Sequence, residues 1–94
     1  MPRDYAVLVS KKAQRQLRRI PRPLAERVRE KLSLLEENPL EPRPGADISL
    51  VWGHDDPPLY RLRVGEYRVL YFVLKTEVRV TEILHRSKAY RGLD

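Results

Sequence analysis

The chain has 94 residues, a net charge of +6, no cysteine, and 41% hydrophobic and 34% charged residues. This length predicts one small domain, residues 1–94, and the lack of cysteine excludes disulfides, Cys-ligated zinc and thiol catalysis. The chain contains no apolar run of membrane-spanning length and its N-terminus lacks the apolar stretch of a signal peptide, so we expect a cytoplasmic protein that does not bind membranes.

The first part of the chain predicts a strand followed by two helices. Residues 5–10 are a short apolar run typical of a strand, and Ser10 is a suitable N-cap for a helix over 11–20. A proline-containing turn ends that helix, and apolar residues at helical spacing predict a second one over 23–38. The two helices form an αα-hairpin whose apolar sides need a sheet to cover.

The second part predicts a loop and then strands. Residues 39–58 are rich in proline and indicate a long ordered loop, in which 48–52 form a short strand or anchor Trp52 in the core. Three β-prone runs follow it: residues 59–64, 67–74 and 78–85. The order β-α-α-β-β-β predicts an α+β fold with two N-terminal helices on a mainly antiparallel sheet.

Charge is unevenly distributed along the chain. Residues 1–31 hold ten Lys/Arg and three Asp/Glu (+7), residues 32–60 one and six (−5), and residues 61–94 eight and four (+4). Two basic blocks around an acidic connector favour a surface for polyanions such as nucleic acid. An acidic partner protein would be attracted to the same surface, and an arginine-rich solvated surface is the simpler alternative.

Arginines interrupt the β-prone runs. Because side chains alternate along a strand, Arg61 and Arg63 share one face, and a hairpin brings Arg68 beside Arg63. Arg86 follows the last run, so we expect the four to meet at one end of the sheet. Like charges this close need an anion, or pairing with nearby carboxylates: Glu66, Glu77 and Glu82.

These residue types suit phosphate chemistry. A guanidinium donates two parallel hydrogen bonds to phosphate and stabilises the charge of a phosphoryl transition state. It stays protonated, so proton transfer would need His85, Tyr90 or a carboxylate such as Glu66. His85 is alternatively an exposed strand-end histidine, and Tyr90 a tyrosine that packs the tail on the core. No spacing of metal ligands is present, so neither a metal nor a cofactor is expected.

The segments "YAVLVSKKAQRQLRRIP", "LEENPLEPRPG", "YRLRVGEYRVLY" and "HRSKAYR" together resemble the RelE/ParE superfamily of toxins from toxin–antitoxin systems. The resemblance implies a sheet backed by two helices and a RelB-like antitoxin that wraps the toxin in a hetero-oligomer. RelE-like members cut mRNA in the ribosomal A site without a protein-bound metal, by attack of a ribose 2′-OH on the adjacent phosphate.

The resemblance also implies site residues. Arg61 and Arg63 fall where RelE-type enzymes have two lysines, and Arg68, Arg86 and Tyr90 match basic and tyrosine positions of the family. His85 is an alternative acid or base in this scheme. The residues predicted to contact RNA or the ribosome are Lys11, Lys12, Arg15, Arg18, Arg19 and Lys88.

The sequence therefore predicts a metal-independent, ribosome-dependent mRNA endoribonuclease. It departs from the family in the arginines that replace lysines, in the short spacing between Arg86 and Tyr90, and in a longer, more acidic segment over 48–58. The alternatives are a ParE-like DNA gyrase poison and a binding module that shares the toxin fold without catalysis.

Overall fold

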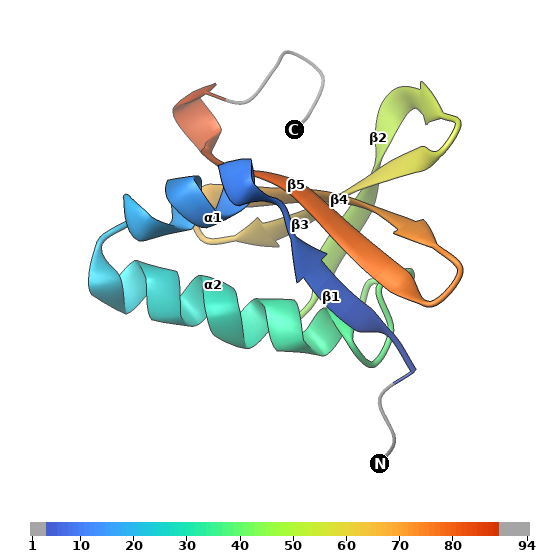
Figure 1. Cartoon of the computed structure of the whole chain (residues 1–94), viewed down its shortest axis with the longest axis horizontal. Helices are drawn as coiled ribbons and strands as arrows, with labels where there is room; N and C mark the ends of the chain where they lie inside the picture. Colours follow the sequence, from blue (N-terminus) through green and yellow to red (C-terminus); the bar gives the residue numbers. More distant parts are fainter. Residues whose placement is uncertain (1–3, 89–94) are drawn as a thin grey trace.

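Five strands form one sheet in the computed structural model, which describes residues 4–88 (Figure 1). The elements in chain order are β1 (Ala6–Val9), α1 (Lys11–Arg18), α2 (Arg22–Leu35), β2 (Asp47–Asp55), β3 (Pro58–Val64), β4 (Tyr67–Leu74), β5 (Glu77–His85) and the short 3-10 helix η1 (Arg86–Lys88). The strand order across the sheet is β1-β5-β4-β3-β2. Strand β1 pairs with β5 in parallel and the other pairs are antiparallel, which confirms the predicted α+β fold.

The sheet has one strand more than the predicted order β-α-α-β-β-β, because part of the expected loop forms β2, which confirms the alternative of a short strand over residues 48–52. This strand pairs with β3 over Asp47–Leu50, and the pairing resumes after a register shift at Asp55. Beyond the shift, β2 and β3 project from the sheet as an arm (Figure 1). Trp52 lies on this arm and is 92% exposed, so the prediction that it anchors the core is wrong. The prolines that suggested a loop precede β2 or lie at the turn into β3, where they interrupt no ladder.

Side-chain hydrogen bonds mark the start of α1 and the end of α2. The Ser10 Oγ accepts a hydrogen bond from the Ala13 N–H at 3.0 Å, which is the predicted N-cap of α1. The same hydroxyl donates to the Thr81 carbonyl in β5 and thereby ties the start of α1 to the sheet. At the other end of α2, the Arg43 guanidinium donates to the carbonyls of Leu34 and Asn38. Arg43 thereby ties the loop after α2 to the last turn of the helix.

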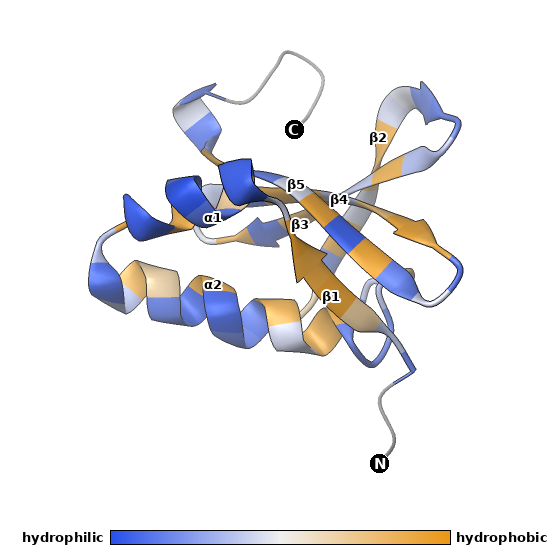
Figure 2. Ribbon diagram, viewed as in Figure 1, coloured by the Kyte–Doolittle hydropathy of each residue, from blue (hydrophilic) through white to orange (hydrophobic). Residues whose placement is uncertain are grey.

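The core lies between the helices and one face of the sheet. Its fully buried residues include Ala13, Val28 and Leu35 from the helices, and Leu62 and Val69 from the strands. Apolar and polar residues alternate over the first half of β5 (Figure 2), and Val78, Val80 and Ile83 of this strand belong to the core.

A buried tyrosine joins the core to the loop after α2. The Tyr71 hydroxyl donates to the Pro39 carbonyl at 2.6 Å, and its ring stacks on Tyr60 with centroids 5.6 Å apart. Burial raises the pKa of Tyr71 well above its usual range; the neighbouring Tyr60 adds to this rise and Arg43 opposes it. The phenol therefore stays a neutral donor.

The face of the sheet turned away from α2, called here the open face, carries a smaller apolar cluster. Val51 and Leu70 are buried there, with Leu59 and Leu84 packed against them. None of the helices in residues 4–88 is long and apolar enough to cross a membrane.

Candidate functional site

The predicted arginines of β3 and β4 lie together on the open face. In the ladder between the two strands Arg63 is directly opposite Arg68, and Arg61 is opposite Leu70. Residues opposite each other share a face, and Leu70 belongs to the open-face cluster. The alternation along the strands therefore places Arg61, Arg63 and Arg68 on that face, as the sequence predicted.

The three arginines differ in exposure. Arg63 is exposed, Arg61 is half-buried, and Arg68 is only 1% exposed. The Arg68 Nη1 donates to the carbonyls of Gly65 at 3.0 Å and Tyr67 at 3.1 Å. Arg68 thus holds the β3–β4 turn, whereas Arg63 presents its guanidinium to solvent.

Arg86 joins this end of the sheet through the same turn. Its backbone N–H donates to the Glu66 carbonyl at 2.7 Å, and its Nη2 lies 3.7 Å from the Glu66 Oε1. The other two carboxylates considered as partners bind elsewhere, Glu77 to Arg79 and Glu82 to Lys12. Glu66 is therefore the carboxylate that the structure brings to Arg86.

His85 lies on the opposite face of the sheet from the arginines. It is paired with Tyr67 in the ladder, and the two rings meet edge to face with centroids 5.4 Å apart. Tyr67 packs against the core on the helix side. The His85 Nδ1 lies 2.8 Å from the Ser87 Oγ, and its Nε2 lies 3.1 Å from the Glu66 Oε2. Both ring nitrogens thus have partners, and one of these partners, Glu66, is shared with Arg86.

Tyr90, the other residue predicted to move a proton, lies outside the described residues. Its role stays a prediction.

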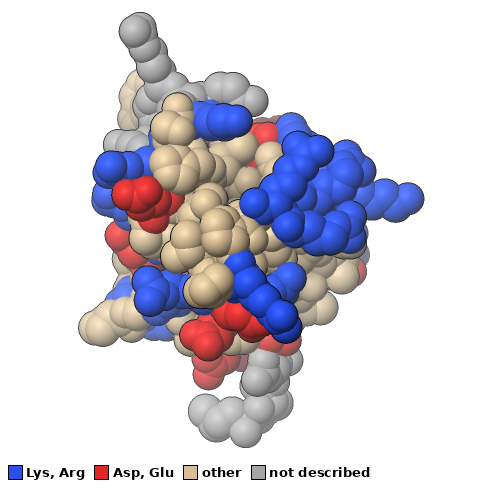
Figure 3. Space-filling model, turned by 90° about the vertical axis from the view of Figure 1, so that its left-hand side faces the viewer, with Lys and Arg blue, Asp and Glu red and all other residues tan. Residues whose placement is uncertain are grey.

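The residues predicted to contact RNA or the ribosome are exposed on the surface of α1 and η1. The N-terminal set is Lys11, Lys12, Arg15, Arg18 and Arg19, and Lys88 ends η1. No acidic residue occurs between residues 5 and 25, so α1 has no carboxylate of its own. Figure 3 shows a broad patch of Lys and Arg on the side of the molecule where α1 meets α2. Lys12 lies 2.6 Å from the Glu82 carboxylate in β5.

Sequence reasoning missed a second group of basic side chains, beneath the edge of the sheet. Arg27, Lys31 and Arg43 line a hollow together with Arg63. A local signal was present, because Arg27 and Lys31 are four residues apart on a helix and so share one side of it. Their proximity to Arg63 depends on how α2 packs under β3.

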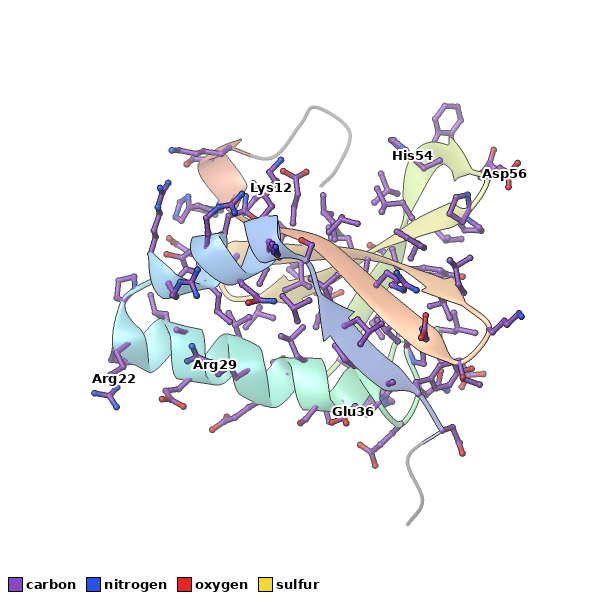
Figure 4. The ribbon with its side chains drawn as sticks, viewed as in Figure 1. Lys12, Arg22, Arg29, Glu36, His54 and Asp56 are labelled. Carbon is purple, nitrogen blue, oxygen red and sulfur yellow. The ribbon has the colours of Figure 1, made fainter. Side chains whose placement is uncertain are left out.

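The β2–β3 arm carries no Lys or Arg between positions 44 and 60. His54 and Asp56 lie at its outer end, away from the centre of the sheet (Figure 4). The arm therefore takes no part in the arginine cluster.

Comparisons with known proteins agree with this fold. Residues 7–90 match the family described as the ParE toxin of type II toxin–antitoxin systems, parDE. A protein of Methanocaldococcus jannaschii named "Putative toxin RelE1" is 29% identical over 90 residues, covering 94% of this chain and 97% of the relative.

Two solved complexes contain similar chains. One is the archaeal RelE–RelB complex of Pyrococcus horikoshii, with a TM-score of 0.76 and 31% identity over 92% of this chain and 99% of that one. The other is the RelBE2 toxin–antitoxin complex of Mycobacterium tuberculosis, with a TM-score of 0.65 and 25% identity over 88% of this chain and 99% of that one. The family match over most of the chain, together with the order of strands and helices, shows that this protein belongs to the ParE toxin family of type II toxin–antitoxin systems, within the RelE/ParE superfamily.

Proposed function

We propose that this toxin is of the RelBE type and acts as a ribosome-dependent endoribonuclease that cuts mRNA in the cytoplasm. The observation that carries the proposal is the arginine cluster on the open face, where Arg63 lies directly opposite Arg68 and next to Arg61. A cluster of guanidinium groups suits a phosphodiester, and one of them, Arg63, is exposed. Similarity to RelE-named proteins supports the choice of RNA.

The arginines would bind the scissile phosphate and stabilise its transition state. In the reaction the 2′-oxygen of one ribose forms a bond to the adjacent phosphorus, and the bond from phosphorus to the 5′-oxygen of the next nucleotide breaks. The 2′-OH loses a proton and the leaving 5′-oxygen gains one, which yields a 2′,3′-cyclic phosphate and a 5′-hydroxyl end. Arg61, Arg63 and Arg86 would face the extra negative charge that develops on the phosphate oxygens.

In this scheme Tyr90 is a better candidate than His85 for the group that transfers the proton. The His85 ring lies on the helix side of the sheet, and Glu66 and Ser87 occupy its nitrogens. A base must come within hydrogen-bond reach of the 2′-OH, and the sheet separates His85 from Arg61, Arg63 and Arg68, while its link to Arg86 runs through the shared Glu66 carboxylate.

The proposed partners are a RelB-like antitoxin and the ribosome carrying its mRNA. Solved complexes of similar chains contain RelE together with RelB, which supports the antitoxin. The exposed cations of α1 and Lys88 would contact RNA phosphates of the substrate or the ribosome.

Mapping message ends by primer extension in a translating extract tests the proposal. We expect cuts at a fixed position within codons. Arg63→Ala should lower cleavage at least about 10-fold, because it removes an exposed charge-stabilising group. The matched control is Arg79→Ala, an exposed arginine of the same sheet that binds Glu77. Intact messages with the wild-type toxin, or equal cleavage by the two variants, would contradict the proposal.

A gyrase poison is the second candidate, because the matching family is that of ParE toxins. In that case the toxin would inhibit DNA supercoiling by purified gyrase and leave messages uncut. Running both assays on one preparation separates the two functions.

A further inference from the structure

A groove runs along α2 where this helix faces the end of β3 and the β3–β4 turn. It consists of two adjoining hollows that share Arg27, Val64 and Gly65. The larger hollow measures about 410 Å³ and also contains Lys31 and Arg63. The smaller measures about 170 Å³ and also contains Leu24 and Tyr67. We call the whole the α2 groove, and its parts the basic hollow and the apolar hollow.

The basic hollow concentrates positive charge. Four cationic side chains line it, Arg27, Lys31, Arg43 and Arg63, against one carboxylate, Asp47, which leaves a net charge of +3. Arg63 and Asp47 are neighbours in the β2–β3 ladder, yet they form no ion pair in the described part of the chain. Like charges gathered around one hollow repel one another, and an anion that enters it would relieve this repulsion.

Two of these four cations, Arg27 and Arg63, have no side-chain partner among residues 4–88. The Arg43 guanidinium is held by backbone carbonyls, and the Lys31 Nζ donates to the Gly45 carbonyl at 2.7 Å. Within residues 4–88 neither Arg27 nor Arg63 forms a hydrogen bond or an ion pair through its side chain. Their guanidinium groups, and the remaining two N–H groups of Lys31, are available to a ligand.

The apolar hollow has a different character. Leu24 is 39% exposed and Tyr67 is half-buried, so that both offer apolar surface to the groove. The carboxylate at this end belongs to Glu66, which His85 and Arg86 already hold. An anionic group would therefore be attracted to the basic hollow more strongly than to this end.

The dimensions and polarity of the groove fit a nucleotide. Leu24 and Lys31 are seven residues apart on α2, which corresponds to about 10 Å along the helix axis. A phosphate and its base are separated by a comparable span. Gly65 lines both hollows, and a Cβ placed there would have no atom within 4 Å other than those of Gly65 and its chain neighbours, so the space above this residue is open to a ligand.

We propose that the α2 groove binds one nucleotide of a single-stranded nucleic-acid chain. Its phosphate would lie against Arg27, Lys31 and Arg63, and its base against Leu24 and Tyr67. Arg63 also belongs to the open-face cluster, so a chain that crosses that cluster continues into the groove. The choice of nucleic acid as the ligand rests on the proposed function. The charge and shape of the groove are observed independently of that proposal. An aromatic ring beside a phosphate site favours a base over the side chains of an acidic peptide.

Binding of fluorescein-labelled octauridylate by the purified toxin, without ribosomes, tests the inference. We expect the double variant Arg27→Ala, Lys31→Ala to weaken binding at least about 10-fold and to lower the slope of log K against log salt by about 1 to 2. The control removes two charges from the same helix outside the groove, Arg22→Ala with Arg29→Ala (Figure 4). It should change binding less than about 3-fold, because distant charges are screened.

The contribution of the base is tested separately by competition. 5′-UMP should displace the labelled RNA at a concentration at least about 5-fold lower than ribose 5-phosphate does, since stacking adds affinity. Leu24→Ser should remove this difference, and circular dichroism confirms that each variant is folded. Because Lys31 also bonds to Gly45, the single variant Arg27→Ala repeats the test without loss of an internal hydrogen bond.

Three results would overturn the inference. The first is that Arg22→Ala with Arg29→Ala weakens binding as much as Arg27→Ala with Lys31→Ala. The second is that ribose 5-phosphate competes as well as UMP. The third is that an octaglutamate peptide competes as well as the RNA for the wild-type toxin but not for the Arg27→Ala, Lys31→Ala variant, which would identify a site for an acidic peptide. The outcome is separable from that of the proposed function. Uncut messages with intact groove binding refute only the cleavage, and codon-positioned cuts with no groove binding refute only the groove.

Discussion

Replacing Arg68 with alanine should destabilise the fold, although the same residue is a candidate for substrate binding. Arg68 is 1% exposed and its guanidinium donates two hydrogen bonds to turn carbonyls. Hydrogen bonds to a charged group contribute about 1.5–3 kcal/mol each. Since Gly65 is exposed, water replaces part of this loss at its carbonyl. We therefore expect a decrease of about 2–4 kcal/mol in the free energy of unfolding.

The matched control is Arg63→Ala. Arg63 lies directly opposite Arg68 on the same face, but it is exposed and makes no side-chain hydrogen bond in residues 4–88. Surface substitutions of this kind usually change stability by less than about 0.5 kcal/mol. A loss of toxicity in Arg63→Ala thus reports on function, whereas the same loss in Arg68→Ala would mix function with folding.

Urea denaturation followed by circular dichroism is the suitable assay. The only tryptophan, Trp52, is 92% exposed in the folded protein, so its fluorescence would change little on unfolding. With a slope of about 1–1.5 kcal/mol per M of urea, the midpoint of Arg68→Ala should fall by at least about 1.3 M. Equal midpoints for Arg68→Ala and Arg63→Ala would refute the structural role given to Arg68.

Three further outcomes follow from the described contacts. Tyr71→Phe should lower the free energy of unfolding by about 1–3 kcal/mol, because it leaves the buried Pro39 carbonyl without a donor. Because burial raises the pKa of Tyr71, the unfolded chain loses this phenolic proton at a lower pH than the folded chain does. The free energy of unfolding, measured by the same urea titration, should therefore fall as the pH rises above about 10, and it should fall less in Tyr71→Phe. Ser10→Ala removes the N-cap of α1 and should cost about 1 kcal/mol in thermal or urea unfolding. Trp52→Ser should leave stability within about 0.5 kcal/mol of wild type, and a larger loss would mean that the arm packs on the core.

Local patterns in the sequence predicted most of the fold. Helical spacing of apolar residues gave both helices, Ser10 gave the start of α1, and alternation put Arg61 and Arg63 on one face. These features depend on residues a few positions apart, and the periods of the helix and the strand are fixed by backbone geometry. For residues 48–52 the proline-rich surroundings left two alternatives open, a short strand or an anchor at Trp52, and the pairing with β3 decides for the strand.

The tertiary structure alone decided the details of the site. Strand alternation holds for any register, but the register between β4 and β5 determines that His85 meets Tyr67 on the helix side. The burial of Arg68 likewise depends on its neighbours in space. Arg68 and the exposed Arg63 both lie between apolar residues of a strand, and the local sequence does not tell them apart. The α2 groove joins Arg27 and Arg63, which are far apart in sequence, through the packing of a helix beneath a strand. Contacts of this kind arise from long-range packing, which residue patterns along the chain do not encode locally.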